Sequence, residues 1–320
     1  MKDFGWCFIG TGSIAFTVAK ELIKNDNSYI ASCFNRTKEK ALKFSLKYGG
    51  KVYDNAIDAM NDENVKCVYI AVTNDKHFEY ALMAIKAKKN VLVEKPFTIN
   101  KMEAIKLINA AKENDVYIAE AMWTWFNDSA IKARELRKEI GEIKYAKMNF
   151  GFPIKSITKK GRLWDIELGG GALLDLGVYP IRYAYELFGK PKEIVADAEL
   201  YNGIDTNTKI LFKYDGFNCL IKASSKHILS ETAVIKGEDG NIKVPFFHTA
   251  HKVICTKNNR RVYRDKSLLY GKQFAIVENE ILTGKKESDY VSLKSTLDIM
   301  EIMDNIRKRI GVIYSQDLDD

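Results

Sequence analysis

Residues 5–119 alternate short apolar segments with amphipathic ones, and this alternation constrains the fold more than any other feature of the chain. The amphipathic segments, such as residues 13–25 and 101–114, repeat their apolar positions with the period of a helix. The apolar segments have the length of strands and lie at 6–10, 29–34, 65–72, 89–95 and 116–121. Strands that are apolar throughout are buried on both faces, as in a parallel sheet with helices on each side. We therefore predict a doubly wound α/β domain over residues 1–120, with turns or loops at Gly49–Gly50 and Asp54–Asn55.

The pattern changes after a helical segment near residues 127–140. From residue 142 to residue 257 the chain shows period-two alternation, interrupted by turn signals at 214–216 and 238–240. This pattern predicts an antiparallel sheet with one face in contact with solvent. Two more helices are predicted around 270–283 and 292–310. Residues 121–320 are therefore predicted to form an α+β domain on an open, mostly antiparallel sheet, which would serve substrate binding and oligomerisation.

Composition excludes several classes of protein. The 320 residues carry a formal net charge of +8, but the basic residues are mixed with acidic ones and accompany no nucleic-acid-binding motif. We interpret them as a lysine-rich solvated surface, which is also compatible with a basic groove for an anionic cofactor. Without a run of about 18 apolar residues or a signal peptide, neither a membrane partner nor export is expected, and we predict a cytoplasmic protein. The five cysteines form no CxxC pair, so we expect reduced core thiols and no metal site.

The first predicted strand ends in GTGSIA, residues 10–15. Gly10, Gly12 and Ala15 fit the pattern G-x-G-x-x-G/A, in which backbone N–H groups and a helix N-terminus bind a pyrophosphate. The motif is weak alone, but it lies here at the first strand–helix junction of a Rossmann-type domain. We therefore predict that Gly10, Thr11, Gly12, Ser13 and Ile14 bind a dinucleotide; the alternative is a tight turn without a ligand.

The end of the second predicted strand indicates which dinucleotide is bound. NAD-binding domains usually have Asp or Glu there to bind the ribose 2′-hydroxyl, whereas this chain has Asn35, Arg36, Thr37 and Lys38. A guanidinium attracts a 2′-phosphate, so we predict NADP, with NAD as the alternative. The alternative is that Arg36 and Lys38 are ordinary surface charges at the start of a helix.

Two further segments carry side chains for proton transfer. Glu94, Lys95 and Pro96 follow a parallel strand at the sheet edge where ligands bind in α/β folds. The second segment, ELGGGALLDLGVYP, has Asp175 and Tyr179 four residues apart, and they share one face if the run is helical. Its glycines let the backbone approach a flat ring, and Pro180 indicates that a helix begins or bends nearby. The alternative is a glycine-rich loop ahead of a core helix.

The combination of GTGSIA, VYIAVTNDKH, EKP and GGGALLDLGVYP resembles the Gfo/Idh/MocA oxidoreductases. The stretches AEAMWTWF and RLWDIELGGGALLDLGVYP are most similar to the dimeric dihydrodiol dehydrogenase branch. The resemblance implies that Lys95 and Asp175 lie at the nicotinamide, and that Tyr179 stands where many members have His. It also implies that the loop with Thr73, Asn74 and His77 covers the cofactor. The branch often has Arg at the position of Trp125, so no particular substrate is carried over.

We expect reversible oxidation of a sugar, polyol or vicinal diol, with hydride transfer to the nicotinamide. Tyr179, whose class has an ordinary pKa of ~10, would accept the hydroxyl proton if cationic Lys95 lowers its pKa. Lys95 acting directly as acid and base is the alternative, while Asp175 would orient the substrate hydroxyl or Lys95. The segments around these groups suggest substrate contacts for Trp123, Trp125, Phe152 and Arg162, although such aromatic residues equally often belong to a core.

Two other functions stay open from the sequence. A redox-neutral enzyme would retain its cofactor, as in oxidative glycoside cleavage, whereas a catalytically silent regulator would bind NADP without turnover. Lys95, Asp175 and Tyr179 are all present, which favours an enzyme. The family usually associates through the open sheet face, so a homodimer or higher homo-oligomer is expected.

Overall fold

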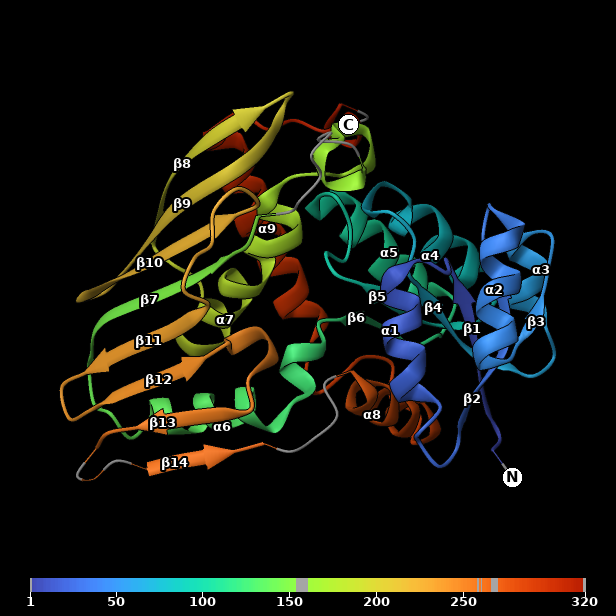
Figure 1. The fold of residues 1–320 in the computed structure, drawn as a ribbon, viewed down its shortest axis with the longest axis horizontal. Coiled ribbons are helices and arrows are strands. Elements are labelled where there is room, and N and C mark those ends of the chain that lie inside the picture. Colours follow the sequence, from blue (N-terminus) through green and yellow to red (C-terminus); the bar gives the residue numbers. More distant parts are fainter. Residues whose placement is uncertain (1, 154–160, 258, 260, 266–269, 319–320) are drawn as a thin grey trace. The chain divides into compact units, whose positions relative to one another are not determined.

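The computed structural model describes residues 2–153, 161–257, 259, 261–265 and 270–318. Contacts divide the chain into two compact units, drawn together in Figure 1. Unit 1 comprises Met1–Phe126 and Leu268–Leu297, and unit 2 comprises Asn127–Ser267 and Asp298–Asp320. Each unit is described here by itself.

Unit 1 is built on a six-stranded parallel sheet in the order β3-β2-β1-β4-β5-β6. The central strand is fully buried, which confirms the predicted doubly wound parallel sheet. The strands are β1 (Phe4–Ile9), β2 (Ser28–Phe34), β3 (Lys51–Val52), β4 (Val65–Ile70), β5 (Asn90–Glu94) and β6 (Ile118–Ala121). The helices between them are α1 (Ser13–Leu22), α2 (Lys38–Tyr48), α3 (Ala56–Asn61), α4 (His77–Lys86) and α5 (Lys101–Glu113).

The α8 helix (Gly271–Leu282) belongs to unit 1 and is bound to it through carboxylates. Glu21 of α1 accepts hydrogen bonds from the backbone N–H groups of Tyr270 and Gly271 at 2.6 and 2.8 Å, at the start of α8. Glu280 of α8 is buried, and its carboxylate accepts a hydrogen bond from the Tyr117 hydroxyl at 2.7 Å. These bonds provide acceptors for those backbone and hydroxyl donors, so α8 is an integral part of unit 1.

Unit 2 contains an eight-stranded sheet in the order β14-β13-β12-β11-β7-β10-β9-β8. All neighbouring pairs are antiparallel except β7 and β10, which confirms an open, mostly antiparallel sheet. Its strands are β7 (Ile143–Gly151), β8 (Glu193–Tyr201), β9 (Ile204–Tyr214), β10 (Phe217–Ser224), β11 (Thr232–Gly237), β12 (Asn241–Pro245), β13 (Lys252–Cys255) and β14 (Arg261–Arg264).

Helices cover one face of this sheet. Figure 1 shows α6 (Asp128–Arg137) and α7 (Val178–Phe188) on the same side of it. The α9 helix (Leu293–Ile310) begins in unit 1 and continues into unit 2. The residues beneath α6 and α7, such as Met148, Ile210 and Ile221, have no exposed surface. The sheet core therefore lies between the strands and these helices.

The opposite face carries one continuous row of partly exposed side chains, which we call the open-face row. The pairing register places one residue of each strand side by side across the sheet. The row runs Val195, Leu211, Leu220, Lys147, Val234, Lys243, Ile254, Val262. Six of its eight members are apolar, which is unusual for a sheet surface in contact with water.

All five cysteines are buried and free, as predicted for core thiols. Burial raises the pKa of the Cys7 thiol to about 12 and that of Cys33 to about 11, so both are protonated at neutral pH. Within the described ranges, no helix is long and apolar enough to cross a lipid bilayer.

Candidate active site

The GTGSIA loop connects β1 to α1, and its two glycines, Gly10 and Gly12, are present for different structural reasons. Gly10 has φ +94°, and a Cβ there would lie 2.4 Å from the carbonyl oxygen of Ala71. Gly12 has an ordinary φ of −81° at the N-cap of α1, and a Cβ there would meet no protein atom within 4 Å. Gly10 is therefore required by the fold, whereas Gly12 leaves space at the helix N-terminus. That space fits a dinucleotide pyrophosphate, since backbone N–H groups and the helix dipole favour an anion there.

A hollow of about 1130 Å³ extends from this loop between α1 and α2. Thr11, Gly12 and Ser13 form one end of it, and Phe16 and Tyr48 contribute aromatic walls. Four lysines line the rest of it together with one acid, Glu21: they are Lys20, Lys40, Lys43 and Lys47. The excess of cations makes the surroundings of the loop favourable for a phosphorylated ligand.

Asn35, at the end of β2, joins the second strand to the phosphate loop. Its amide donates to the Thr11 hydroxyl at 2.9 Å and its carbonyl oxygen accepts the N–H of Thr37 at 3.0 Å. Arg36 is exposed beside this bond, and its charge opposes the rise that burial causes in the pKa of Tyr80. Lys38, by contrast, is paired with Asp54 at 2.5 Å. Arg36 is therefore the better placed of the two cations to meet a ribose phosphate.

The segment Glu94–Pro96 follows β5, and hydrogen bonds connect it to the neighbouring strand and loop. The Tyr69 hydroxyl of β4 donates to the Glu94 carboxylate, which also accepts the N–H of Lys95 at 3.2 Å. His77 is buried at the start of α4, and its Nδ1 is hydrogen-bonded to the Pro96 carbonyl oxygen at 2.8 Å. The predicted cofactor loop and the EKP segment are thus brought together. Thr73 precedes the short helix Asn74–Lys76 that joins β4 to α4.

In unit 2, the glycine-rich segment leads into a π-helical turn, η5 (Leu173–Gly177), which continues directly into α7. Asp175 lies in η5 and Tyr179 lies in the first turn of α7, as does Pro180, where a missing N–H is tolerated. Asp175 pairs with Arg162, whose Nη2 lies 3.0 Å from its Oδ1. The buried carboxylate thus has a cationic partner from a segment that the sequence linked to substrate binding.

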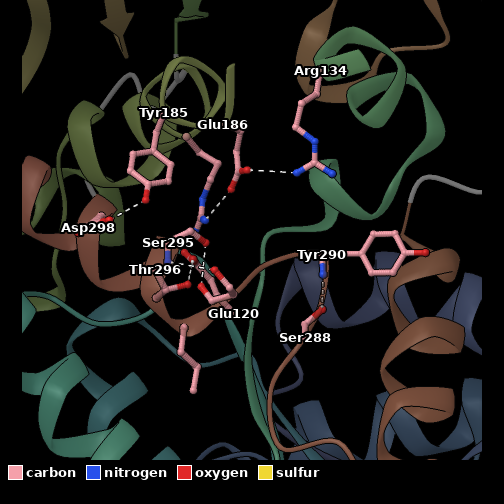
Figure 2. Close-up of polar contacts among 12 residues, drawn as sticks. Glu120, Arg134, Tyr185, Glu186, Ser288, Tyr290, Ser295, Thr296 and Asp298 are labelled. Carbon is pink, nitrogen blue, oxygen red and sulfur yellow. Dashed lines mark hydrogen bonds and ion pairs between the residues drawn. The ribbon is translucent and has the colours of Figure 1, made fainter. Parts of the chain in front are cut away.

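Ion pairs and a hydrogen bond hold α7 in place (Figure 2). Arg182 has no exposed surface, and its Nη1 lies 3.2 Å from Oε1 of Glu186. The other oxygen of Glu186 is 3.5 Å from Arg134 of α6. Tyr185 donates to Asp298 of α9 at 2.6 Å. The helix that carries Tyr179 is therefore fixed on two sides.

The predicted substrate-contact residues are divided between the two units. Trp123 and Trp125 are buried in unit 1, where Trp123 packs on Tyr270 with ring centres 4.5 Å apart. Phe152 is 45% exposed and belongs to unit 2. Its neighbour Phe150 packs edge-on against Tyr179, with ring centres 5.6 Å apart.

The sequence did not predict His248, which lies beside Tyr179, or its partner Glu231. The ring of His248 lies 5.5 Å from that of Tyr179, and its Nδ1 contacts the Glu231 carboxylate. His248 is a lone histidine in a loop after β12, and no motif marks its link to Glu231 across a hairpin. Among all residues that the structure describes, no group of three or more His, Cys, Asp or Glu residues could hold a metal ion.

Comparison with known proteins identifies the family. The family model described as "Oxidoreductase family, NAD-binding Rossmann fold" matches residues 4–121, and the GFO/IDH/MocA C-terminal domain model matches residues 130–243. The chain belongs to the Gfo/Idh/MocA oxidoreductase family. Together the two models cover most of the chain, so the membership confirms the resemblance found in the sequence.

Relatives and solved structures match over nearly the full length. Trans-1,2-dihydrobenzene-1,2-diol dehydrogenase of Danio rerio is 29% identical, with 98% of each chain covered. The scyllo-inositol 2-dehydrogenase (NADP(+)) IolU of Bacillus subtilis is 27% identical, again with 98% of each chain covered. The structure of KijD10, a 3-ketoreductase from Actinomadura kijaniata in complex with NADP and TDP-benzene, aligns with a TM-score of 0.86 and 22% identity, over 98% of this chain and 99% of that one.

The space at Gly12 leads to a first prediction. In Gly12→Val, the new Cβ meets no protein atom within 4 Å, so the protein is expected to keep its melting temperature. The same side chain would occupy the space left for the pyrophosphate, so NADPH affinity should fall by at least ~100-fold, as for a blocked phosphate site. Fluorescence titration with NADPH measures this. Gly10→Ala is the contrasting variant, because its Cβ strikes backbone and should lower the melting temperature.

Proposed function

We propose that the protein is an NADP-dependent dehydrogenase or reductase that acts on a CH–OH group of a sugar, polyol or vicinal diol. The observation that carries the proposal is the open space at Gly12, beside an exposed arginine at the end of β2. The names of the Danio rerio and Bacillus subtilis relatives support the substrate class, since one acts on a cyclic diol and the other on an inositol.

The residues of unit 1 fit the cofactor in a consistent way. Gly10, Thr11, Gly12, Ser13 and Ile14 would bind the pyrophosphate, and Asn35 and Arg36 would bind the adenosine ribose and its 2′-phosphate. Thr73, Asn74, His77, Glu94 and Lys95 would bind toward the nicotinamide end. When bound, the nicotinamide supplies or accepts the hydride.

The proton must be handled by side chains of the chain itself. Tyr179 Oη is the proposed proton carrier for the substrate hydroxyl, and Lys95 Nζ is the alternative. Asp175 would orient the reacting hydroxyl, with its own position held by Arg162 at 3.0 Å. Because Arg162 is engaged with Asp175, we propose that it acts through this carboxylate rather than as a direct anion-binding group. Trp123, Trp125 and Phe152 remain proposed substrate contacts.

We also propose that the protein works in the cytoplasm as a homodimer or larger homo-oligomer. Five buried thiols without a disulfide suit a reducing compartment. The open-face row supports self-association, because its six apolar side chains lose contact with water when a second copy covers them.

Replacing Arg36 tests the choice of cofactor. Arg36→Ala should weaken NADPH binding by about 10- to 100-fold, as for the loss of charge-assisted bonds to a phosphate, and should leave NADH binding nearly unchanged. Parallel fluorescence titrations measure both affinities. Lys38→Ala is the matched control, since Lys38 is already paired with Asp54 and its loss should not alter the preference. A wild-type protein that binds NADH more tightly than NADPH would overturn the choice of NADP.

Turnover with NADP and a panel of cyclic diols, inositols and aldoses tests the reaction itself, and two variants separate the proton carriers. If Tyr179 accepts the proton during oxidation, Tyr179→Phe lowers kcat by about 10²- to 10⁴-fold and removes the limb of the pH profile in which kcat falls as this base becomes protonated. Lys95→Met then lowers kcat but keeps that limb, although displaced. The reverse pattern assigns the proton to Lys95. A protein that binds NADPH but turns over nothing in the panel would be a silent regulator.

Association is tested at the open-face row. Light scattering after size-exclusion chromatography should give a multiple of the 36.4 kDa chain mass for the wild type. The double variant Leu211→Glu, Leu220→Glu places two adjacent charges within the row and should reduce the mass to one chain. Leu46→Glu is the control, because Leu46 is an 89% exposed leucine of α2 in unit 1.

A further inference from the structure

The turn ahead of Asp175 is folded around a buried carboxylate that belongs to another strand. Gly169 and Gly171 have φ values of +68° and +115°. A Cβ at Gly170 would lie within 2.9 Å of three backbone carbonyl oxygens, those of Arg162, Leu163 and Asp165. A Cβ at position 171 would lie 2.5 Å from Oδ1 of Asp205 in β9. The third glycine is therefore needed to make room for this carboxylate.

Asp205 is bound to the first residue of the segment that carries the reactive side chains. It has no exposed surface, and its Oδ2 accepts the backbone N–H of Leu173 at 2.8 Å. The Thr208 hydroxyl donates to the same oxygen. Leu173 begins η5, which contains Asp175 and continues into the helix with Tyr179. The carboxylate thus accepts at the N-terminal end of this helical segment, where a negative charge is favourable.

The charged side chains around Asp205 do not form an ion pair with its carboxylate. Among the residues that the structure describes, it takes part in no ion pair, and its Oδ1 has no hydrogen-bond partner. Tyr314 lies on the same turn, and its hydroxyl donates to the Gly170 carbonyl at 2.5 Å. Arg307 lies over the Tyr314 ring, 5.1 Å from its centre, but is paired with Asp304 and Asp317.

A buried carboxylate in this position lowers the stability of the folded protein at neutral pH. Burial raises the pKa of Asp205 to about 6, although the hydrogen bonds from Thr208 and Leu173 oppose the rise. An unfolded aspartate titrates near ~4, so the folded protein holds this proton more tightly. The stabilisation from the bound proton is complete below pH ~4 and is lost as pH rises through about 6. A group that is unfavourable for stability when charged points to a functional reason for its presence.

We propose that Asp205 is a positioning residue for the reaction: its carboxylate holds the start of the segment that presents Asp175 and Tyr179. It does so through the Leu173 N–H, which an ionised acceptor binds more strongly than a neutral one. The effect on turnover rests on the proposed function, whereas the anchoring itself does not.

The test uses Asp205→Asn in the full-length protein and measures amide exchange and turnover separately. The amide keeps the size of the side chain but removes the charge, so the Leu173 amide should exchange at least about tenfold faster at pH 7.5. The melting temperature at this pH should stay unchanged or rise, since a buried charge is removed. With NADPH and an accepted substrate, kcat should fall at least about tenfold while NADPH affinity is unchanged. The acid limb of the kcat profile near pH 6 should also disappear.

Two further variants make each outcome decisive. Asp215→Asn changes an exposed aspartate at the β9–β10 turn and should alter none of these quantities. Thr208→Val removes one donor to the carboxylate, so the Asp205 titration, followed by carboxyl NMR, should move above its wild-type midpoint. Wild-type exchange at Leu173 and wild-type kcat in Asp205→Asn would overturn the proposal. If the wild type turns over no substrate, the proposed function fails, and the exchange data still decide whether Asp205 anchors the segment.

Discussion

A parallel sheet that is buried on both faces leaves polar chemistry only at the ends of its strands, and unit 1 follows from this constraint. Its central strands have no polar face, so every group that could meet a dinucleotide comes after a strand has ended. Gly10 follows β1, Asn35 follows β2, and Lys95 follows β5. The hydrogen bond from Asn35 to Thr11 shows how closely these ends are coupled: the residue expected near the ribose also fixes the phosphate loop.

Unit 2 differs from unit 1 in this respect, because its sheet has helices on only one face. Polar side chains of its helices and strands that enter the interior need hydrogen-bond or ionic partners there. The structure provides them in two ways. Arg182 and Glu186 are neutralised within α7, and Arg134 adds a second cation. Asp205 is instead left charged but hydrogen-bonded, at the start of η5. The first arrangement fixes a helix to its neighbours, whereas the second keeps a destabilising charge next to the candidate catalytic residues.

The sequence predicted the elements that are long enough to show a period, and it failed where an element is short or a contact is remote. The turns or loops predicted at Gly49–Gly50 and Asp54–Asn55 do lie outside the regular elements, but β3, with two residues, and α3, with six, were not predicted. The pairing of β7 with β10 is parallel, and no alternation pattern distinguishes a parallel neighbour from an antiparallel one. The Asp175–Arg162 bond joins two residues that the sequence had marked separately. The Asp205 anchor and the His248–Glu231 contact arise from strand register, which a single sequence does not contain.

The positions of the lysines explain part of the positive net charge, which composition alone does not. A formal charge of +8 would be unremarkable if the cations were spread evenly. Three of the four lysines of α2 line the hollow beside the phosphate loop, and Lys20 of α1 lies across from them. Their field falls off over about 10 Å at moderate salt, which is long enough to act on a dinucleotide before it docks. The basic character of the chain is thus partly local: the lysines gather beside the loop where we propose that an anionic cofactor binds, and Arg36 and the loop N–H groups are the proposed source of selectivity.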